Sequence, residues 1–116
     1  MRVEVILSPD EAKHHNFQGK ACVVIDVFRF TTTVLTALEA GMERFFPVEG
    51  IEEAFKLKEV KPELFLGGER QALKIPGFDF GNSPLEHVGK NYAGGELICT
   101  TTNGTRAIRA AQGANE

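Results

Sequence analysis

The sequence predicts an α/β layer fold around a largely parallel or mixed sheet. Short apolar runs rich in β-branched residues alternate along the chain with segments of helical periodicity, as in folds whose strands are joined by helices. The run at residues 21–25 is apolar throughout, which is typical of a parallel strand buried on both faces. With 116 residues, 42% of them apolar, the chain is long enough for one core, so residues 1–116 are expected to form a single α/β domain.

The amino-terminal part is predicted to contain two strands with a short helix between them. Residues 3–7 are mostly apolar and are expected to form the first strand. Ser8 and Pro9 follow as a helix N-cap and first helical residue, because a serine oxygen accepts from the free N–H groups there and proline lacks one. Residues 21–25 are expected to form the second strand.

The middle of the chain is predicted as a helix, a strand and a second helix. Residues 31–40 have the apolar spacing of a helix, and Gly41 stands where a C-cap glycine commonly lies. Residues 44–48 are expected to form a strand and residues 51–60 an amphipathic helix.

The last part is predicted to bring two strands and a long loop. Residues 63–67 form the first of these strands, and the glycine-rich loop at 68–83 is long enough to suggest a function. Ser83-Pro84-Leu85-Glu86 is the pattern of a capping box that opens a short helix. Residues 96–100 are the last strand, and a threonine-rich turn leads from it into a helix that reaches Ala111.

Composition and charge narrow the classes of partner. A formal net charge of -3 and a pI near 5.6 give no basic stripe for a nucleic-acid backbone, so no nucleic acid is expected. No apolar run approaches the roughly 18 residues of a spanning helix, so no membrane is expected, and the start is too short and charged for a signal peptide. The expected location is cytoplasmic, and the sequence is compatible with a homo-oligomer. Cys22 and Cys99 lie in apolar runs without metal-ligand spacing, which favours buried thiols.

Residues 100–105 are predicted to form an anion-binding turn between a strand and a helix. The segment is dense in hydroxyls, its asparagine and glycine tolerate left-handed backbone, and the following helix offers free N–H groups. An arginine beside the turn could pair with a phosphate or carboxylate. A plain helix cap is the alternative, and the arginine shifts the balance toward binding. The residues expected to bind the anion are Thr102, Asn103, Gly104, Thr105 and Arg106.

Asp26 marks a second polar turn, directly after the predicted buried strand. Arg29 and three threonines follow within seven residues, and Thr32 among them is a candidate for substrate binding. A carboxylate at the end of a buried strand is a common place for a Mg²⁺ ligand or a nucleophile. The alternative is that Asp26 only caps the helix and that Arg29 forms a surface ion pair. This alternative is disfavoured, because polar residues at the end of a buried strand need polar partners.

A third polar turn follows the strand at 63–67. Glu69 is the second candidate metal ligand, and Arg70 the third arginine placed after a strand. The glycines before them let the backbone approach a ligand closely. Farther along, Asn82 and Ser83 either cap the short helix alone or also face the site.

Familiar phosphate-binding signatures are absent from the sequence. Neither G-x-x-x-x-G-K-[ST] nor G-x-G-x-x-G occurs, and Asp26 lacks the second aspartate of an aspartyl-phosphate phosphatase. Six residues separate Cys99 from Arg106, one more than the loop of a cysteine phosphatase allows.

Three ordered blocks of sequence resemble the 2-phosphosulfolactate phosphatase family. They are residues 24–33 (VIDVFRFTTT), residues 67–70 (GGER) with residues 74–84 (KIPGFDFGNSP), and residues 100–106 (TTTNGTR). The resemblance implies a three-layer α/β/α fold and a Mg²⁺-dependent phosphatase that releases phosphate from 2-phospho-3-sulfolactate, a step toward coenzyme M. Family members are longer, so this chain looks like the N-terminal portion of such a phosphatase.

Together these observations predict a phosphatase acting on a small anionic phosphorylated substrate. Asp26 and Glu69 are expected to hold or orient Mg²⁺, and Arg29, Arg70 and Arg106 to position the phosphate, carboxylate and sulfonate of the substrate. The predicted catalytic residues are Asp26, Arg29, Glu69 and Arg106. A metal-activated water is the preferred nucleophile and Asp26 the alternative. A non-catalytic sensor of a phosphorylated acid is the alternative function, although two carboxylates repel an anion unless a metal lies between them.

Overall fold

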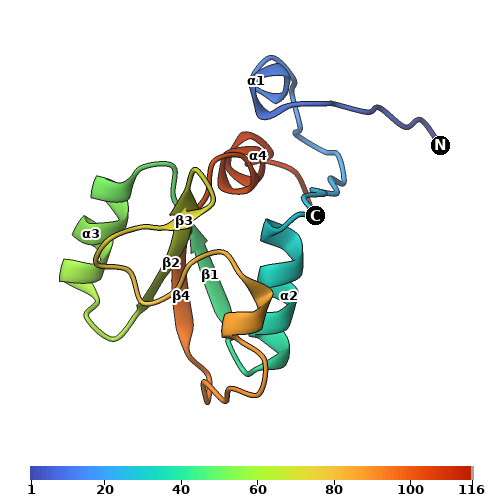
Figure 1. The fold of residues 1–116 in the computed structure, drawn as a ribbon. Helices are drawn as coiled ribbons and strands as arrows, with labels where there is room; N and C mark the ends of the chain where they lie inside the picture. Colours follow the sequence, from blue (N-terminus) through green and yellow to red (C-terminus); the bar gives the residue numbers. More distant parts are fainter. Residues whose placement is uncertain (116) are drawn as a thin grey trace.

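A four-stranded sheet lies between helices on both faces (Figure 1) in the computed structural model, which describes residues 1–115. The strands are β1 (Arg44–Pro47), β2 (Phe65–Arg70), β3 (Leu73–Lys74) and β4 (Glu96–Thr100). The helices are α1 (Pro9–Ala12), α2 (Phe30–Glu39), α3 (Ile51–Val60), the 3-10 turn η1 (Pro84–Glu86) and α4 (Gly104–Ala110). The predicted α/β fold is confirmed.

The sheet is mixed, with strand order β1-β4-β2-β3. Strand β4 lies in the middle and pairs in parallel with both β1 and β2, while β3 pairs antiparallel with β2. The carboxyl ends of β1, β4 and β2 therefore meet at one edge, as they do in open α/β sheets that bind ligands there.

Two separate cores cover the two faces of the sheet, because successive strand residues point to opposite sides. On β4, Leu97 packs in the cluster that contains Ala37 of α2, while Ile98 packs in the cluster that contains Ala54 of α3. The same division holds on the neighbouring strands, with Phe45 and Phe65 on the α2 side and Phe46 and Leu66 on the α3 side. This is the predicted three-layer arrangement.

Several predicted elements match the structure closely. The helix at 51–60 and the strand at 96–100 have the predicted bounds, and the strand at 44–48 differs by one residue. Gly41 has φ of 97° after α2, as a C-cap glycine does. The longest helices between residues 1 and 115 have 10 residues each, and none there is long and apolar enough to cross a membrane.

The predicted loop at 68–83 is partly wrong, because backbone pairing continues into it. Strand β2 extends to Arg70 and turns back into β3, and the N–H of Phe80 donates to the carbonyl of Leu66 at 3.0 Å. The capping box is also wrong, since Ser83 makes no side-chain capping bond. Both carboxylate oxygens of Glu86 instead accept from the N–H of Gly81 at 3.1 Å, and η1 is a single 3-10 turn.

The two predicted amino-terminal strands are wrong as well. Residues 3–7 and 21–25 join no sheet in the structure, although 21–25 was expected to be buried on both faces. Val23 and Ile25 are 85% and 77% exposed. A strand is stable only when a neighbour satisfies its N–H and C=O groups, and within residues 1–115 these segments have no neighbouring strand. Figure 1 shows the amino-terminal segment extending away from the sheet.

Candidate active site at the carboxyl edge of the sheet

The carboxyl ends of β2 and β4 lie side by side, and polar residues follow both strands. Gly68 of β2 is level with Thr100 of β4. A Cβ atom on Gly68 would lie 2.1 Å from the Thr100 carbonyl oxygen, so glycine is required for the strands to approach here. We call this edge, made of Glu69, Arg70 and residues 100–105, the carboxyl-edge site.

Glu69 ties the end of β2 to the threonine-rich turn after β4. Its Oε1 accepts from the backbone N–H and the hydroxyl of Thr102 at 2.8 and 2.9 Å, and its Oε2 accepts from the N–H of Ala72 at 3.0 Å. Burial alone would raise the pKa of this carboxyl, which is 8% exposed, but the bonds from Thr102 and Ala72 and the charge of Arg70 together hold the pKa below its ordinary value. Glu69 is therefore an ionised acceptor in a fixed position.

Arg70 connects the ends of three parallel strands through uncharged acceptors. Its Nη2 donates to the hydroxyl of Thr100 at 2.8 Å and to the carbonyl of Glu49 at 2.9 Å, and its Nη1 donates to the carbonyl of Glu69 at 2.7 Å. In the described part of the chain no carboxylate oxygen lies within ion-pair distance of this guanidinium. Its positive charge is thus fixed at the edge and available to an anion.

The threonine-rich turn is held together by its own hydroxyls. The N–H of Thr101 donates to Oγ1 of Thr105 at 3.1 Å, and the N–H of Thr105 donates to Oγ1 of Thr101 at 3.1 Å. Both threonines are buried, whereas Thr102 and Asn103 are exposed. Thr105 therefore serves the turn itself, and the exposed pair is the part of the turn that a ligand can reach.

Left-handed backbone, which the sequence would tolerate here, does not occur in this turn. Asn103 has φ of −124° and makes no side-chain cap, and Gly104 is absent from the glycines with positive φ in residues 1–115. Glycine is needed at 104 for another reason, since a Cβ atom would lie 2.3 Å from the ring of Phe30. The glycine is required for the packing of α4 on α2, and its role in binding an anion stays a prediction.

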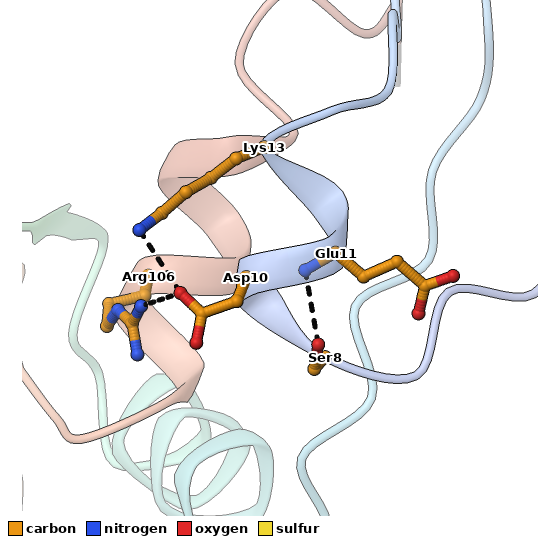
Figure 2. A network of polar contacts seen from close by, with 5 residues as sticks. All are labelled: Ser8, Asp10, Glu11, Lys13 and Arg106. Carbon is orange, nitrogen blue, oxygen red and sulfur yellow. Dashed lines mark hydrogen bonds and ion pairs between the residues drawn. The ribbon is translucent and has the colours of Figure 1, made fainter.

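Arg106 points to α1 instead of standing free beside the turn. Its Nη2 lies 2.5 Å from Oδ1 of Asp10, and Nζ of Lys13 lies 3.2 Å from the same oxygen. Figure 2 shows both contacts converging on Asp10. Helix α1 begins with the predicted N-cap, in which the hydroxyl of Ser8 accepts from the N–H of Glu11 at 3.1 Å. Hydrogen bonds from Lys13 and Arg106 lower the pKa of Asp10. Anion binding by Arg106 stays a prediction, and it requires this exposed ion pair to open.

The turn before α2 is closed by its backbone and its threonines. Thr31 donates its N–H to the carbonyl of Asp26 at 2.8 Å and accepts from the N–H of Asp26 through Oγ1 at 3.0 Å. The hydroxyl of Thr32 donates to the carbonyl of Val27 at 2.7 Å, and the hydroxyl of Thr33 donates to the carbonyl of Arg29 at 2.9 Å. Among the described residues, the carboxylate of Asp26 and the guanidinium of Arg29 make no hydrogen bond or ion pair.

The predicted metal ligands fit Mg²⁺ only in part. No group of three or more His, Cys, Asp or Glu side chains suited to a metal gathers within residues 1–115. Three donors already occupy the oxygens of Glu69, while the carboxylate of Asp26 is free of them. Because Mg²⁺ usually takes one or two protein carboxylates together with water and phosphate oxygens, this set would need oxygens from a substrate.

Asn82 and Ser83 lie where the loop before η1 meets α2. The carbonyl of Asn82 accepts from the Thr33 hydroxyl at 3.2 Å, which fixes its backbone against the helix. Both residues are half-buried, and neither has a side-chain hydrogen bond within the described chain. Their role in binding a substrate stays a prediction.

His87 is a buried polar residue that sequence reasoning missed, since nothing around it forms a motif. It is 1% exposed, and its Nδ1 lies 2.8 Å from the hydroxyl of Tyr92. Its Nε2 has no partner in the described part of the chain, and the ring lines a cavity of about 10 Å³ with Thr33, Asn82 and Thr101. Burial lowers the pKa of His87, so the ring is neutral near pH 7.

Cys99 lies beneath the site and is not available as a nucleophile. Burial raises the pKa of its thiol to about 12, so a thiolate does not form near neutral pH. This agrees with the spacing between Cys99 and Arg106, which does not fit a cysteine phosphatase. The predicted buried thiol is confirmed for Cys99, while Cys22 is only half-buried.

Comparison with known proteins places the chain among relatives of one kind. A family model described as 2-phosphosulpholactate phosphatase matches residues 6–116. A probable 2-phosphosulfolactate phosphatase of Clostridium acetobutylicum is 46% identical over 117 residues, which cover 100% of this chain and 50% of the relative. One of Carboxydothermus hydrogenoformans is 48% identical over 111 residues, covering 96% of this chain and 45% of the relative. The chain thus spans about half the length of the curated relatives it matches.

Proposed function

The chain belongs to the 2-phosphosulpholactate phosphatase family, and on that premise we propose that it contributes the carboxyl-edge site of a phosphatase for a small 2-phospho acid. The first candidate substrate is 2-phospho-3-sulfolactate, with 3-sulfolactate and inorganic phosphate as products, in a step toward coenzyme M. Support comes from the names of the relatives, which are probable 2-phosphosulfolactate phosphatases. The relatives are about twice as long as this chain, so the phosphatase activity itself is part of the proposal.

The guanidinium of Arg70 is the observation that carries this proposal. It is held by three uncharged acceptors at the meeting point of β1, β4 and β2, and no carboxylate oxygen in the described chain lies within ion-pair distance of it. An ester phosphate bound at this edge would accept a charge-assisted hydrogen bond from the Arg70 guanidinium, whose position is already fixed. The exposed Thr102 and Asn103 would contact the same anion from the turn after β4.

Arg29 and Arg106 are proposed to hold the two other anionic groups of the substrate. The guanidinium of Arg29 has no partner within residues 1–115, so it can bind a carboxylate or sulfonate directly. Arg106 would first have to leave Asp10. Because that ion pair is exposed, it is easily exchanged for a substrate anion.

The proposed reaction is hydrolysis of the phosphate ester. A water oxygen forms a bond to phosphorus, the bond from phosphorus to the C2 oxygen breaks, and the leaving oxygen takes a proton to become the hydroxyl of 3-sulfolactate. Asp26 and Glu69 would hold Mg²⁺, which when bound neutralises phosphate charge. Asp26 is the carboxylate still free to act on the attacking water or to attack phosphorus itself, since Glu69 is occupied by Thr102 and Ala72.

Anion binding can be tested on this chain by titration calorimetry with 2-phosphosulfolactate. Arg70→Met removes the charge but keeps an apolar stem of similar length, and we expect affinity to fall about tenfold or more. Arg44→Met is the matched control, because Arg44 lies at the opposite end of β1 in an ion pair with Glu96. Equal loss in both variants would remove the carboxyl-edge site from the proposal.

Hydrolysis is tested by phosphate release from 2-phosphosulfolactate, with Mg²⁺ and with a chelator, for this chain and for the intact C. acetobutylicum relative. We expect release that requires Mg²⁺ and is lost when the aspartate aligned with Asp26 becomes Asn. Trapping of a phosphorylated aspartate after rapid quench would establish Asp26 as the nucleophile instead of water. Binding without any release by either protein would favour a sensor of a phosphorylated acid.

A further inference from the structure

Exposed apolar residues gather in the amino-terminal quarter of the molecule. Residues 3–7 and 21–28 place seven large apolar side chains at the surface, each more than half exposed: Val3, Val5, Leu7, Val23, Ile25, Val27 and Phe28. The two predicted strands, residues 3–7 and 21–25, lie in these segments, and neither joins the sheet. Such a concentration of apolar surface on a short stretch is typical of an interface rather than of a free surface.

Residues 21–27 alternate in the manner of a strand that lacks a neighbour. Cys22, Val24 and Asp26 are half-buried, whereas the residues between them are exposed. Within residues 1–115 the segment pairs with no strand, and it is anchored at its ends only, where Lys20 accepts from the N–H of Asn115 at 2.8 Å and Asp26 bonds to Thr31. One face therefore rests on the domain, and the other face and the backbone groups between the two anchors are left to solvent.

An apolar cavity of about 140 Å³ lies beneath this segment. Its lining includes Val24 of this segment, Phe45 and Pro47 of β1, and Ile108 of α4. A cavity of this size can hold one large apolar side chain, since an engineered apolar cavity of about 150 Å³ takes up benzene. Strand β1 is also the outermost strand of the sheet, with no neighbour on its second side in the described chain.

We propose that residues 21–27 and the outer edge of β1 form a docking surface for the half of the family polypeptide to which this chain does not align. The relatives are about twice as long as the matched region, so each has a second half of comparable size. The occupant would add a β-strand beside residues 21–27 and place an apolar side chain in the cavity. A second copy of this chain explains the surface less well, because in the relatives the unaligned half is joined covalently to this region and is therefore present at a high effective concentration.

Amide hydrogen exchange tests the proposed surface. In this chain alone, the amide hydrogens of residues 23–25 should exchange at the rates of unpaired backbone amides. When the chain is co-expressed with the unaligned half of the C. acetobutylicum relative, the two should co-purify at 1:1, and exchange at these amides should slow by on the order of 1,000-fold, as paired strands do. The intact relative gives the decisive measurement, because its two halves are already joined: fast exchange at its aligned positions would overturn the proposal.

Matched substitutions separate docking from folding. Val23→Lys and Ile25→Lys change side chains that are exposed in the isolated chain, so its unfolding midpoint should not move, while co-purification should fall at least tenfold. Val60→Lys is the control, since Val60 is 77% exposed at the end of α3 and away from this surface. Equal co-purification of all three variants would contradict the proposal. Concentration-dependent dimers of this chain with slowed exchange at residues 23–25 would contradict it in favour of a second copy.

Discussion

Residues 21–25 and residues 96–100 were both predicted as strands of five residues, and each is followed by a threonine-rich turn and a helix. The second run is β4, the central strand, where Ile98 is fully buried and pairs with strands on both sides. The first run has no paired neighbour in the described chain, and Ile25 is 77% exposed. Both turns carry the same kinds of polar residue, yet only the turn after β4 is fixed by bonds from another strand, through Glu69.

This difference shows what an apolar run does and does not specify. The run specifies an extended backbone and a side chain period, but burial also requires a neighbouring strand to satisfy the N–H and C=O groups. Strand β4 has β1 and β2 beside it and helices on both faces, so its turn becomes rigid. The turn after residues 21–25 is closed only by local bonds, which leaves the carboxylate of Asp26 unpaired in the described chain.

The largest expected effect on stability is the difference between truncating Ile98 in β4 and truncating Ile25 in the unpaired segment. Ile98→Ala should lower the free energy of unfolding by about 2–5 kcal/mol, because it leaves a cavity in the core between the sheet and α3. Ile25→Ala should change it by less than about 0.5 kcal/mol, since that side chain is exposed. Urea denaturation of both variants measures the difference. A loss at Ile25 as large as at Ile98 would mean that residues 21–25 are buried in solution.

A second prediction concerns the contact between β2 and β4. Gly68→Ala should cost about 3 kcal/mol or more, because the added Cβ would meet the backbone oxygen of Thr100 and force the strands apart. Gly50→Ala is the control, since its Cβ would meet only Glu53 at 3.9 Å. Thermal unfolding compares the two. Similar midpoints would show that the strands can separate here without loss.

The contrast between β4 and residues 21–25 also explains which parts of the structure could be predicted from the sequence. The strand β4 and the helix α3 were predictable because each has its full pattern within a few residues, and the alternation of such patterns predicted the α/β fold. The three-layer arrangement was implied by the family resemblance. The exposure of residues 21–25 was not, because it depends on which strands are present to pair with them. Glu69 was predicted as a metal ligand from its place after a strand, but its bonds to Thr102 and Ala72 depend on β4 lying beside β2. His87 could not be found, since its burial comes from packing against Tyr92 and Phe80.

The third prediction tests the rigidity of the turn after β4. Glu69→Gln replaces an oxygen by an amide nitrogen, leaves at least one N–H donor unpaired, and should cost about 1–3 kcal/mol at pH 7. The wild-type protein has a lowered pKa at Glu69, so this stabilisation is present above the ordinary value of 4.5 and is lost as the pH falls through the lower pKa of the folded state. Urea titrations at several pH values should show that the variant lacks this acid-dependent loss. If the variant lost as much stability at acid pH as the wild type does, the pH dependence would come from other carboxyl groups.

A smaller pH effect should come from His87, at a higher pH. Because burial lowers the pKa of His87, the unfolded chain takes up a proton near 6.5 that the folded ring takes up only at lower pH. The stability is therefore complete above pH 6.5 and falls as the pH drops through the pKa of the folded state. His87→Gln should flatten this part of the curve, whereas Tyr92→Phe removes only the hydroxyl beside Nδ1 and should keep it. A slope that survives His87→Gln would place its source elsewhere.

The smallest effect on stability, and the sharpest test of the turn, is expected at Asp10. Asp10→Asn should leave the unfolding midpoint unchanged, because its ion pair with Arg106 is exposed and local. If Arg106 serves the carboxyl-edge site, however, removing the competing carboxylate should raise the affinity for inorganic phosphate about twofold to tenfold at low salt. Glu53→Gln frees Arg109 in the same way on the neighbouring turn of α4 and should leave that affinity unchanged. Equal affinities in wild type and Asp10→Asn would mean that the anion is held by Arg70 and the exposed turn, and that Arg106 belongs to the docking of α1 on α4.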